Sequence, residues 1–224
     1  MSGSCRYVLA AMVTLGSVAH AGPPAPCPRA PVSDSSAPRD IDALFTLLRF
    51  DRLERLQATF SEEKHIALLA RPLRQSGTIY FDRSRGIARL TRAPRQERVV
   101  LTTTSLRIEK GNQVEEIPLD KSKGLRAFAM VFPALLRGDR AELEAAFALS
   151  LSGTPRQAWS LTLTPVEPAL CGLVSRLVVS GQGAEVSRVQ TFEASGDTTD
   201  TRFSGIAKNT AVPAAEIARA FGRR

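Results

Sequence analysis

The sequence is poor in the side chains that most enzymes and nucleic-acid-binding proteins rely on. Its 224 residues include one Trp, two Tyr, two His and three Cys. Unpaired nucleobases stack on aromatic side chains, and this chain has few aromatics from which to build a nucleic-acid-binding surface. The net charge of +8 invites such a role, but 25 of the 30 basic residues are Arg and they are scattered along the chain. We therefore expect no nucleic-acid partner.

Long apolar runs are also missing, since nothing approaches the roughly 20 apolar residues of a membrane-spanning helix. At the N-terminus, Arg6 precedes a shorter apolar run over residues 7–18, and the small-residue site Ala19-His20-Ala21 follows it. This order is typical of a secretory signal peptide. We expect residues 1–21 to be removed, leaving a soluble protein in the periplasm of a Gram-negative bacterium.

Proline is concentrated rather than scarce. Residues 22–38 hold six of the 14 prolines among Ser, Ala and Gly, a composition that favours an extended tether over a packed element. We expect one folded domain over residues 39–224, starting with a helix near Asp40. No internal repeat or second domain boundary is visible.

Two cysteines, Cys27 and Cys171, remain after removal of the signal peptide. In an oxidising compartment such a pair is a candidate for one disulfide. If the bond forms, it ties the proline-rich segment to the loop at residues 165–172. The alternative is two unpaired thiols.

Alternation of apolar and polar residues dominates the rest of the chain. In residues 53–65, for example, Leu56, Ala58 and Phe60 alternate with polar neighbours, which predicts a half-buried strand. Similar patterns predict strands at residues 77–82, 86–91, 98–103, 105–109, 114–117, 148–152, 158–164, 173–180, 185–194 and 200–206.

Between residues 120 and 148 the spacing changes to that of a helix. Leu125, Phe128, Phe132 and Leu135 fall on one stripe. The segment Asp139-Arg140-Ala141-Glu142 is a capping-box pattern that opens a second short helix. A last helix is expected over residues 213–221. Many short strands with few helices predict a mainly β protein with one large antiparallel sheet, curled or barrel-like.

Catalytic motifs are absent. The sequence has no nucleophile elbow, zinc-protease, Cys-x-x-Cys, P-loop or dinucleotide-binding signature. We interpret His65 as an ordinary residue at the end of a strand. Neighbours such as Glu62 and Glu63 point to opposite faces of a strand and are not paired carboxylates. Asp197 to Asp200 is interpreted as a hairpin turn rather than a calcium site. We expect no enzyme activity, no metal and no cofactor.

Residues 58–108 resemble the LolA-type periplasmic carriers of outer-membrane lipoproteins. Ala58-Thr59-Phe60-Ser61-Glu62 is similar to the family's Ala-x-Phe-x-Gln, with Glu in place of Gln, and residues 77–83 are similar to its Gly-x-Leu-Trp-x-x-Arg. Pro94 and Leu106 follow at the family's spacing. The sequence departs from the family where Arg89 and Arg107 stand in place of Trp, where Ser84 stands in place of Pro, and where Thr102-Thr103 replaces Asp-Gly. The resemblance therefore points to a divergent branch.

This resemblance implies a strongly curved, unclosed antiparallel sheet with a helical lid over its concave face. An apolar cavity under the lid would take up acyl chains of lipoproteins, or of another lipid such as a glycolipid. It would carry them from an inner-membrane exporter to an outer-membrane acceptor, with the protein acting as a monomer. Arg83 stands where the family has an Arg that gates the lid through hydrogen bonds. The expected cavity residues are Phe60, Ile79, Phe81, Leu90, Leu106, Ile108, Phe128, Phe132, Leu135, Trp159, Leu161 and Leu163.

A second function class stays open. The same shell could belong to an interaction or assembly protein without lipid cargo that docks a membrane complex through an Arg-rich surface. Residues 71–98 hold eight Arg against Asp82 and Glu97. The alternative interpretation of this segment is a solvated strand face that keeps the protein soluble. For the cavity residues, too, plain core packing is the competing interpretation.

Overall fold

The computed structural model describes residues 27, 38–48 and 50–222. The predicted signal peptide and most of the predicted tether lie outside the described residues. No helix in the described ranges is long and apolar enough to cross a membrane.

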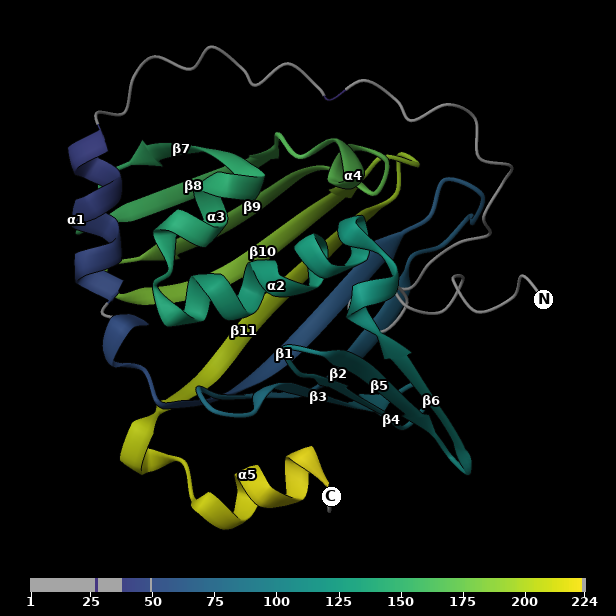
Figure 1. Cartoon of the computed structure of the whole chain (residues 1–224). Helices are drawn as coiled ribbons and strands as arrows, with labels where there is room; N and C mark the ends of the chain where they lie inside the picture. Colours follow the sequence, from purple (N-terminus) through teal and green to yellow (C-terminus); the bar gives the residue numbers. More distant parts are fainter. Residues whose placement is uncertain (1–26, 28–37, 49, 223–224) are drawn as a thin grey trace.

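One 11-stranded antiparallel sheet organises the described chain (Figure 1). Its strand order is β6-β5-β4-β3-β2-β1-β11-β10-β9-β8-β7. The two edge strands, β6 and β7, do not pair with each other, so the strongly curved sheet stays open, as expected. The strands are β1 (Arg55–His65), β2 (Leu73–Asp82), β3 (Gly86–Ala93), β4 (Glu97–Leu101), β5 (Ser105–Lys110), β6 (Gln113–Pro118), β7 (Phe147–Gly153), β8 (Ala158–Pro165), β9 (Val174–Gln182), β10 (Glu185–Glu193) and β11 (Thr198–Lys208).

Helices cover one face of the sheet. Figure 1 shows α2 (Lys123–Arg137) lying across it, with α1 (Pro38–Leu48), α3 (Arg140–Ala146) and α4 (Pro168–Cys171) nearby. The ends of α2 and α3 are capped by side-chain hydrogen bonds and by a glycine. The Ser122 side chain accepts a hydrogen bond from the Leu125 N–H, and Gly138 ends α2 with a positive φ of 70°, a conformation that costs glycine little. The Asp139 side chain caps α3, as its pattern predicted.

The opposite face is covered only in part. Helix α5 (Ala214–Phe221) lies on the far side of β2 and β3 from α2 (Figure 1). Ile217 and Ala220 of α5 form a small apolar cluster with Tyr80, Ala88 and Val100 of the sheet. Strands β2, β3 and β4 therefore bury side chains on both faces, whereas the main apolar cluster lies between the sheet and α1–α4.

The expected strands are all present, with bounds shifted by a few residues. The first helix starts at Pro38, two residues before Asp40, the expected cap; proline's fixed φ suits the first helical turn. The short helix α4 and the 3-10 turns, among them η3 (Phe50–Arg52), have no counterpart in the sequence pattern, because three or four residues are too short to show a period.

Candidate functional site

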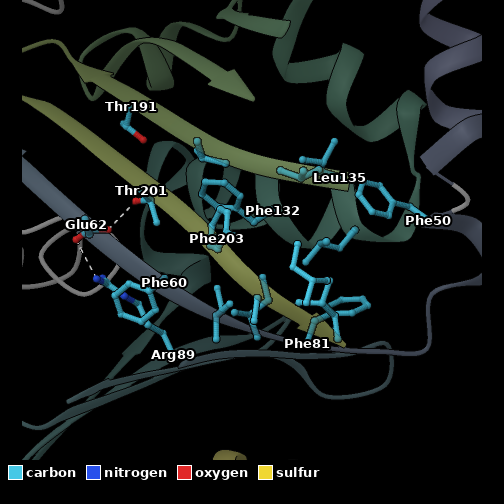
Figure 2. A pocket seen from close by; sticks show the side chains of 18 of the residues that line it. Phe50, Phe60, Glu62, Phe81, Arg89, Phe132, Leu135, Thr191, Thr201 and Phe203 are labelled. Atoms are coloured by element: carbon cyan, nitrogen blue, oxygen red, sulfur yellow. Dashed lines mark hydrogen bonds and ion pairs between the residues drawn. The ribbon is translucent and has the colours of Figure 1, made fainter. Parts of the chain in front are cut away.

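A cavity lies between α2 and the middle of the sheet (Figure 2). Its walls are mostly apolar side chains from β1, β2, β10 and β11, and α2 closes it from above. The centre of a water-sized sphere can move through about 130 Å³ of it. The lining comprises Phe50, Leu56, Ala58, Phe60, Glu62, Ile79, Phe81, Ile87, Arg89, Phe132, Leu135, Leu136, Val186, Val189, Thr191, Thr199, Thr201, Phe203, Ile206 and Lys208.

The side chains that line the cavity follow the two-residue period of a strand on β1 and the helical period on α2. On β1, Ala58, Phe60 and Glu62 are buried toward the cavity, while the intervening Thr59 and Ser61 are exposed on the other face. On α2, Phe132, Leu135 and Leu136 are spaced three and four residues apart, which puts them on one side of the helix. The cavity is therefore built where a period-two face meets a helical stripe.

The cavity has a buried end and a partly exposed end. Glu62, Arg89, Thr191 and Thr199 at one end are all buried, whereas Lys208 at the other is only half-buried. Figure 2 shows Glu62, Arg89 and Thr191 on one side and Phe50 and Leu135 on the other. We call the first group, together with Thr201, the inner end of the cavity.

Five of the twelve expected cavity residues line the cavity: Phe60, Ile79, Phe81, Phe132 and Leu135. Six others are buried in the main apolar cluster without lining the cavity, because they belong to strands nearer the two edges of the sheet or to the first half of α2. These are Leu106, Ile108, Phe128, Trp159, Leu161 and Leu163.

The expected lining requires a correction at Leu90. Its side chain packs in the cluster under α5, on the opposite face of the sheet. Its neighbour Arg89 faces the cavity instead. Successive residues of a strand point to opposite faces. The prediction that Leu90 points into the cavity therefore placed the side chains of β3 on the wrong faces of the sheet.

The expected gating role of Arg83 stays a prediction. Its side chain makes no hydrogen bond to α2 in the described structure. Instead, Arg83 Nη2 donates to the carbonyl oxygens of Phe50 (2.7 Å) and Asp51 (2.9 Å), and Nε donates to that of Leu53 (2.9 Å). Arg83 therefore holds the turn η3, whose Phe50 lines the cavity.

The inner end contains a buried ion pair. Arg89 Nη2 lies 2.9 Å from Glu62 Oε1, with side-chain exposures of 6% and 4%. Arg89 Nη2 also donates to Gln75 Oε1 at 3.0 Å, and Thr201 donates to Glu62 Oε2 at 2.9 Å. The guanidinium carbon lies 4.5 Å from the centre of the Phe60 ring, a cation–π distance. Glu62 and Arg89 are two of the positions where the sequence departs from the LolA pattern, and they bind each other.

A second buried pair lies behind the first. Lys64 Nζ donates to Glu193 Oε1 at 2.7 Å, and both side chains are almost fully buried. Burial raises the pKa of Glu193, while the neighbouring Lys64 ammonium opposes that rise. Each buried positive charge in this region thus has a carboxylate partner.

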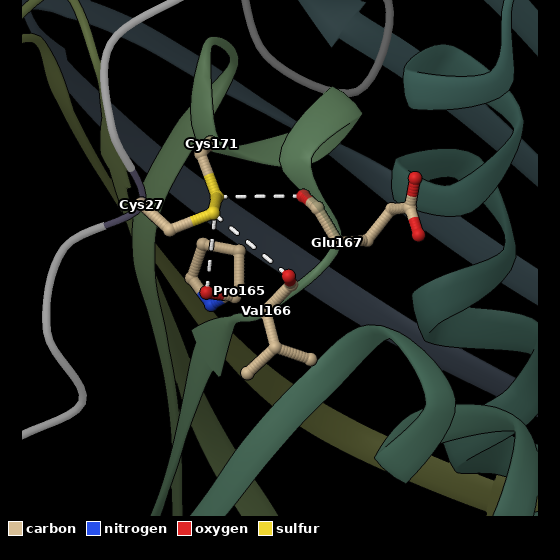
Figure 3. Close-up of a disulfide and its surroundings, with 5 residues drawn as sticks. All are labelled: Cys27, Pro165, Val166, Glu167 and Cys171. Atoms are coloured by element: carbon tan, nitrogen blue, oxygen red, sulfur yellow. Dashed lines mark hydrogen bonds between the residues drawn. A yellow bond between two sulfur atoms is a disulfide. The ribbon is translucent and has the colours of Figure 1, made fainter.

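The two cysteines form a disulfide, Cys27–Cys171 (Figure 3). The bond attaches the segment before α1 to the loop that carries α4. Cys171 is buried, and its sulfur lies 3.4 Å from the carbonyl oxygen of Glu167. The alternative of two free thiols is not the arrangement in this structure.

The other residues weighed as catalytic or metal-binding candidates do not line the cavity. His65 is exposed at the end of β1. Asp197 accepts a hydrogen bond from the Ala67 N–H, and Asp200 forms a two-point ion pair with Arg188. Within the described ranges, no three His, Cys, Asp or Glu side chains come together as a metal site.

Sequence analysis missed one wall of the cavity. Strands β10 and β11 contribute Val186, Val189, Thr191, Thr199, Thr201, Phe203, Ile206 and Lys208. The available signal was the alternation itself, since Thr199, Thr201 and Phe203 share one face of β11. The pairing of β1 with β11, more than 130 residues later in the chain, could not be deduced from local pattern.

Comparisons with known proteins agree with this architecture. A family model described as outer membrane lipoprotein carrier protein LolA-like matches residues 35–223. A search of curated proteins finds no match.

Solved structures resemble the chain at low identity. A LolA superfamily protein from Nitrosomonas europaea is 11% identical, covering 79% of this chain and 96% of its own, with a TM-score of 0.44. A structure of MucB is 17% identical, covering 82% and 63%, with a TM-score of 0.50. The Pseudomonas aeruginosa MucA/MucB complex is 15% identical, covering 80% of this chain and 60% of its own, with a TM-score of 0.47. At 17% identity, the likeness to MucB shows the fold alone.

Proposed function

Because the chain belongs to the family of LolA-like outer membrane lipoprotein carrier proteins, we propose that it is a periplasmic carrier that takes an acyl chain into the cavity under α2. The observation that carries this proposal is the apolar cavity itself. It is lined largely by apolar side chains, and Lys208 at one end of it is half-buried. The cargo would be a lipoprotein or another lipid on its way from the inner to the outer membrane.

The size of the cavity suits one chain. One water needs roughly 10–15 Å³ of volume occupied by a water-sized sphere, and the space open to the centres of such spheres is already about 130 Å³. We therefore take a chain of about ten carbon atoms as the occupant. Burying ten methylenes contributes roughly 8 kcal/mol, of which association costs about 4 kcal/mol or more. The net of roughly 4 kcal/mol or less corresponds to a dissociation constant of about a millimolar or weaker for the chain alone, which suits a carrier that must release its cargo.

The Arg-rich segment gives less support to the alternative of a docking protein without cargo. Four of the eight Arg in residues 71–98 are engaged in ion pairs, and Arg89 is buried in the cavity. The segment is therefore not a uniform basic surface. A protein that fails to bind any lipid would nevertheless favour this second function.

Filling the cavity should abolish uptake. Ile79 lines the cavity from β2, directly opposite Arg89 of β3. We expect Ile79→Trp to weaken binding of the neutral fluorophore N-phenyl-1-naphthylamine at least tenfold, because the indole occupies the space of the ligand. The measurement is a fluorescence titration of the purified protein, together with mass spectrometry of its organic extract.

The matched control is Ser61→Trp, which adds the same side chain at an exposed position on the other face of β1. It should bind like the unmodified protein. Absence of saturable binding and of extracted lipid in the unmodified protein would overturn the carrier function.

A further inference from the structure

The inner end of the cavity is polar, which a site for a plain hydrocarbon chain does not need. Glu62, Arg89, Thr191 and Thr199 are all at least nine-tenths buried and line the cavity. Figure 2 shows the labelled members of this group together, away from Phe50 and Leu135. Along β1, Glu62 lies six positions after Leu56, a length of about 20 Å in an extended strand. A chain that fills the apolar part therefore meets hydrogen-bonding groups at its far end.

The charges at this end are already compensated. Glu62 binds Arg89 and accepts a hydrogen bond from Thr201, and Lys64 binds Glu193 behind them. The inner end consequently carries no net formal charge. An ionised ligand group would enter without a spare counter-ion and would lie close to a carboxylate, which is costly in a buried site. An uncharged hydrogen-bonding group meets no such penalty.

Thr199 supplies an observation that points to a ligand. Its hydroxyl oxygen is buried and has no hydrogen-bond partner within the described ranges, and its side chain lines the cavity. Buried hydroxyl groups are normally satisfied, so an unsatisfied one calls for an explanation. Thr199 pairs directly with Thr191 of β10, so the two side chains stand next to each other on one face of the sheet.

We propose that the cavity selects lipids whose chain ends in an uncharged hydroxyl, ester or amide group, and that Thr199, beside Thr191, binds that group. The inference rests on the proposed lipid-binding function and names its ligand class. The ligand oxygen accepts the Thr199 hydroxyl proton, and a ligand hydroxyl can in turn donate to a neighbouring side-chain oxygen. Ionised fatty acids of the same length are disfavoured because no positive charge at the inner end lacks a carboxylate partner.

Displacement of N-phenyl-1-naphthylamine from the full-length protein at pH 8 tests this proposal. The competitors are 1-decanol, decanoate and decane, each delivered from cyclodextrin. We expect 1-decanol to displace the fluorophore at concentrations at least fivefold lower than decanoate. Thr199→Val removes the hydroxyl at nearly constant shape, and it should weaken 1-decanol about fivefold, the worth of one hydrogen bond, while leaving decane unchanged.

Thr91→Val is the matched control. The Thr91 hydroxyl is also buried without a partner in the described structure, but Thr91 does not line the cavity. This variant should bind all three competitors like the unmodified protein. Equal displacement by 1-decanol in the unmodified protein and in Thr199→Val would overturn the inference while leaving the carrier function standing. If no competitor displaces the fluorophore, the carrier function itself fails.

A second variant tests the polar inner end of the cavity while Thr199 is left unchanged. Glu62→Leu combined with Arg89→Leu replaces the ion pair by apolar side chains and leaves no unpaired buried charge. We expect decane to bind more tightly and the advantage of 1-decanol over decane to shrink at least threefold. An unchanged advantage would contradict the assignment of this end as the binding site for the polar group.

Discussion

Replacing Arg89 by Leu is expected to lower the free energy of unfolding by about 3–5 kcal/mol, the usual cost of removing one member of a buried ion pair. Glu62 and Arg89 are each about 5% exposed, and Arg89 is the charged partner of the carboxylate. Without it, Glu62 stays buried while it accepts a hydrogen bond from the Thr201 hydroxyl. Urea unfolding followed by the fluorescence of Trp159, which is itself buried, measures the effect.

The chain contains a control with the same chemistry and different burial. Glu63, the next residue on β1, lies 2.8 Å from Arg74 of β2, but these side chains are 46% and 75% exposed. Exposed pairs contribute little, so Arg74→Leu should change the free energy of unfolding by less than about 1 kcal/mol. Similar losses for Arg89→Leu and Arg74→Leu would show that burial does not set the strength of the first pair.

The double variant separates the pair's net contribution from the penalty of breaking it. Well-packed apolar replacements of a buried ion pair are often neutral or stabilising. Glu62→Leu with Arg89→Leu should therefore unfold within about 1 kcal/mol of the unmodified protein, or at higher urea, and a double-mutant cycle gives the coupling. If the double variant is as unstable as Arg89→Leu alone, the pair itself stabilises the fold.

The behaviour of Arg89 also shows where sequence reasoning reaches its limit. Alternation predicted every strand, because one side of most strands is buried and the other solvated. Strands β2, β3 and β4 break this rule, since α5 buries Leu90 and Tyr80 on the face opposite the cavity. Hydrophobicity alone then no longer says which face is inward, and the charged Arg89 looked like a surface residue.

The cavity was predicted in kind but only partly in its residues. The helical stripe of α2 placed Phe132 and Leu135 correctly over the sheet, since a stripe on a helix has one apolar side. The wall from β10 and β11 depends on the pairing of β11 with the central strand β1, a long-range contact with no local signal. The polar inner end likewise arises from β1, β3, β10 and β11 and becomes visible only when they are assembled.

Loss of the disulfide is the second large effect we expect. Cys27 and Cys171 are 144 residues apart in the sequence, so the bond encloses most of the domain. A cross-link over a long segment restricts the unfolded chain, and removing one typically lowers the free energy of unfolding by about 2–4 kcal/mol. We expect that loss for the fully reduced protein, measured by urea unfolding with and without dithiothreitol.

Cys27→Ala distinguishes the cross-link from effects of the reductant. Cys27 is only half-buried, whereas Cys171 is buried at the end of α4, so the substitution removes the bond and leaves the buried site intact. The variant should unfold like the reduced protein and should not respond to dithiothreitol. Because Cys27 precedes α1 and its partner lies between β8 and β9, a loss below about 0.5 kcal/mol would mean that the bond secures only the N-terminal segment. In that case the sheet and its cavity would owe their stability to packing alone.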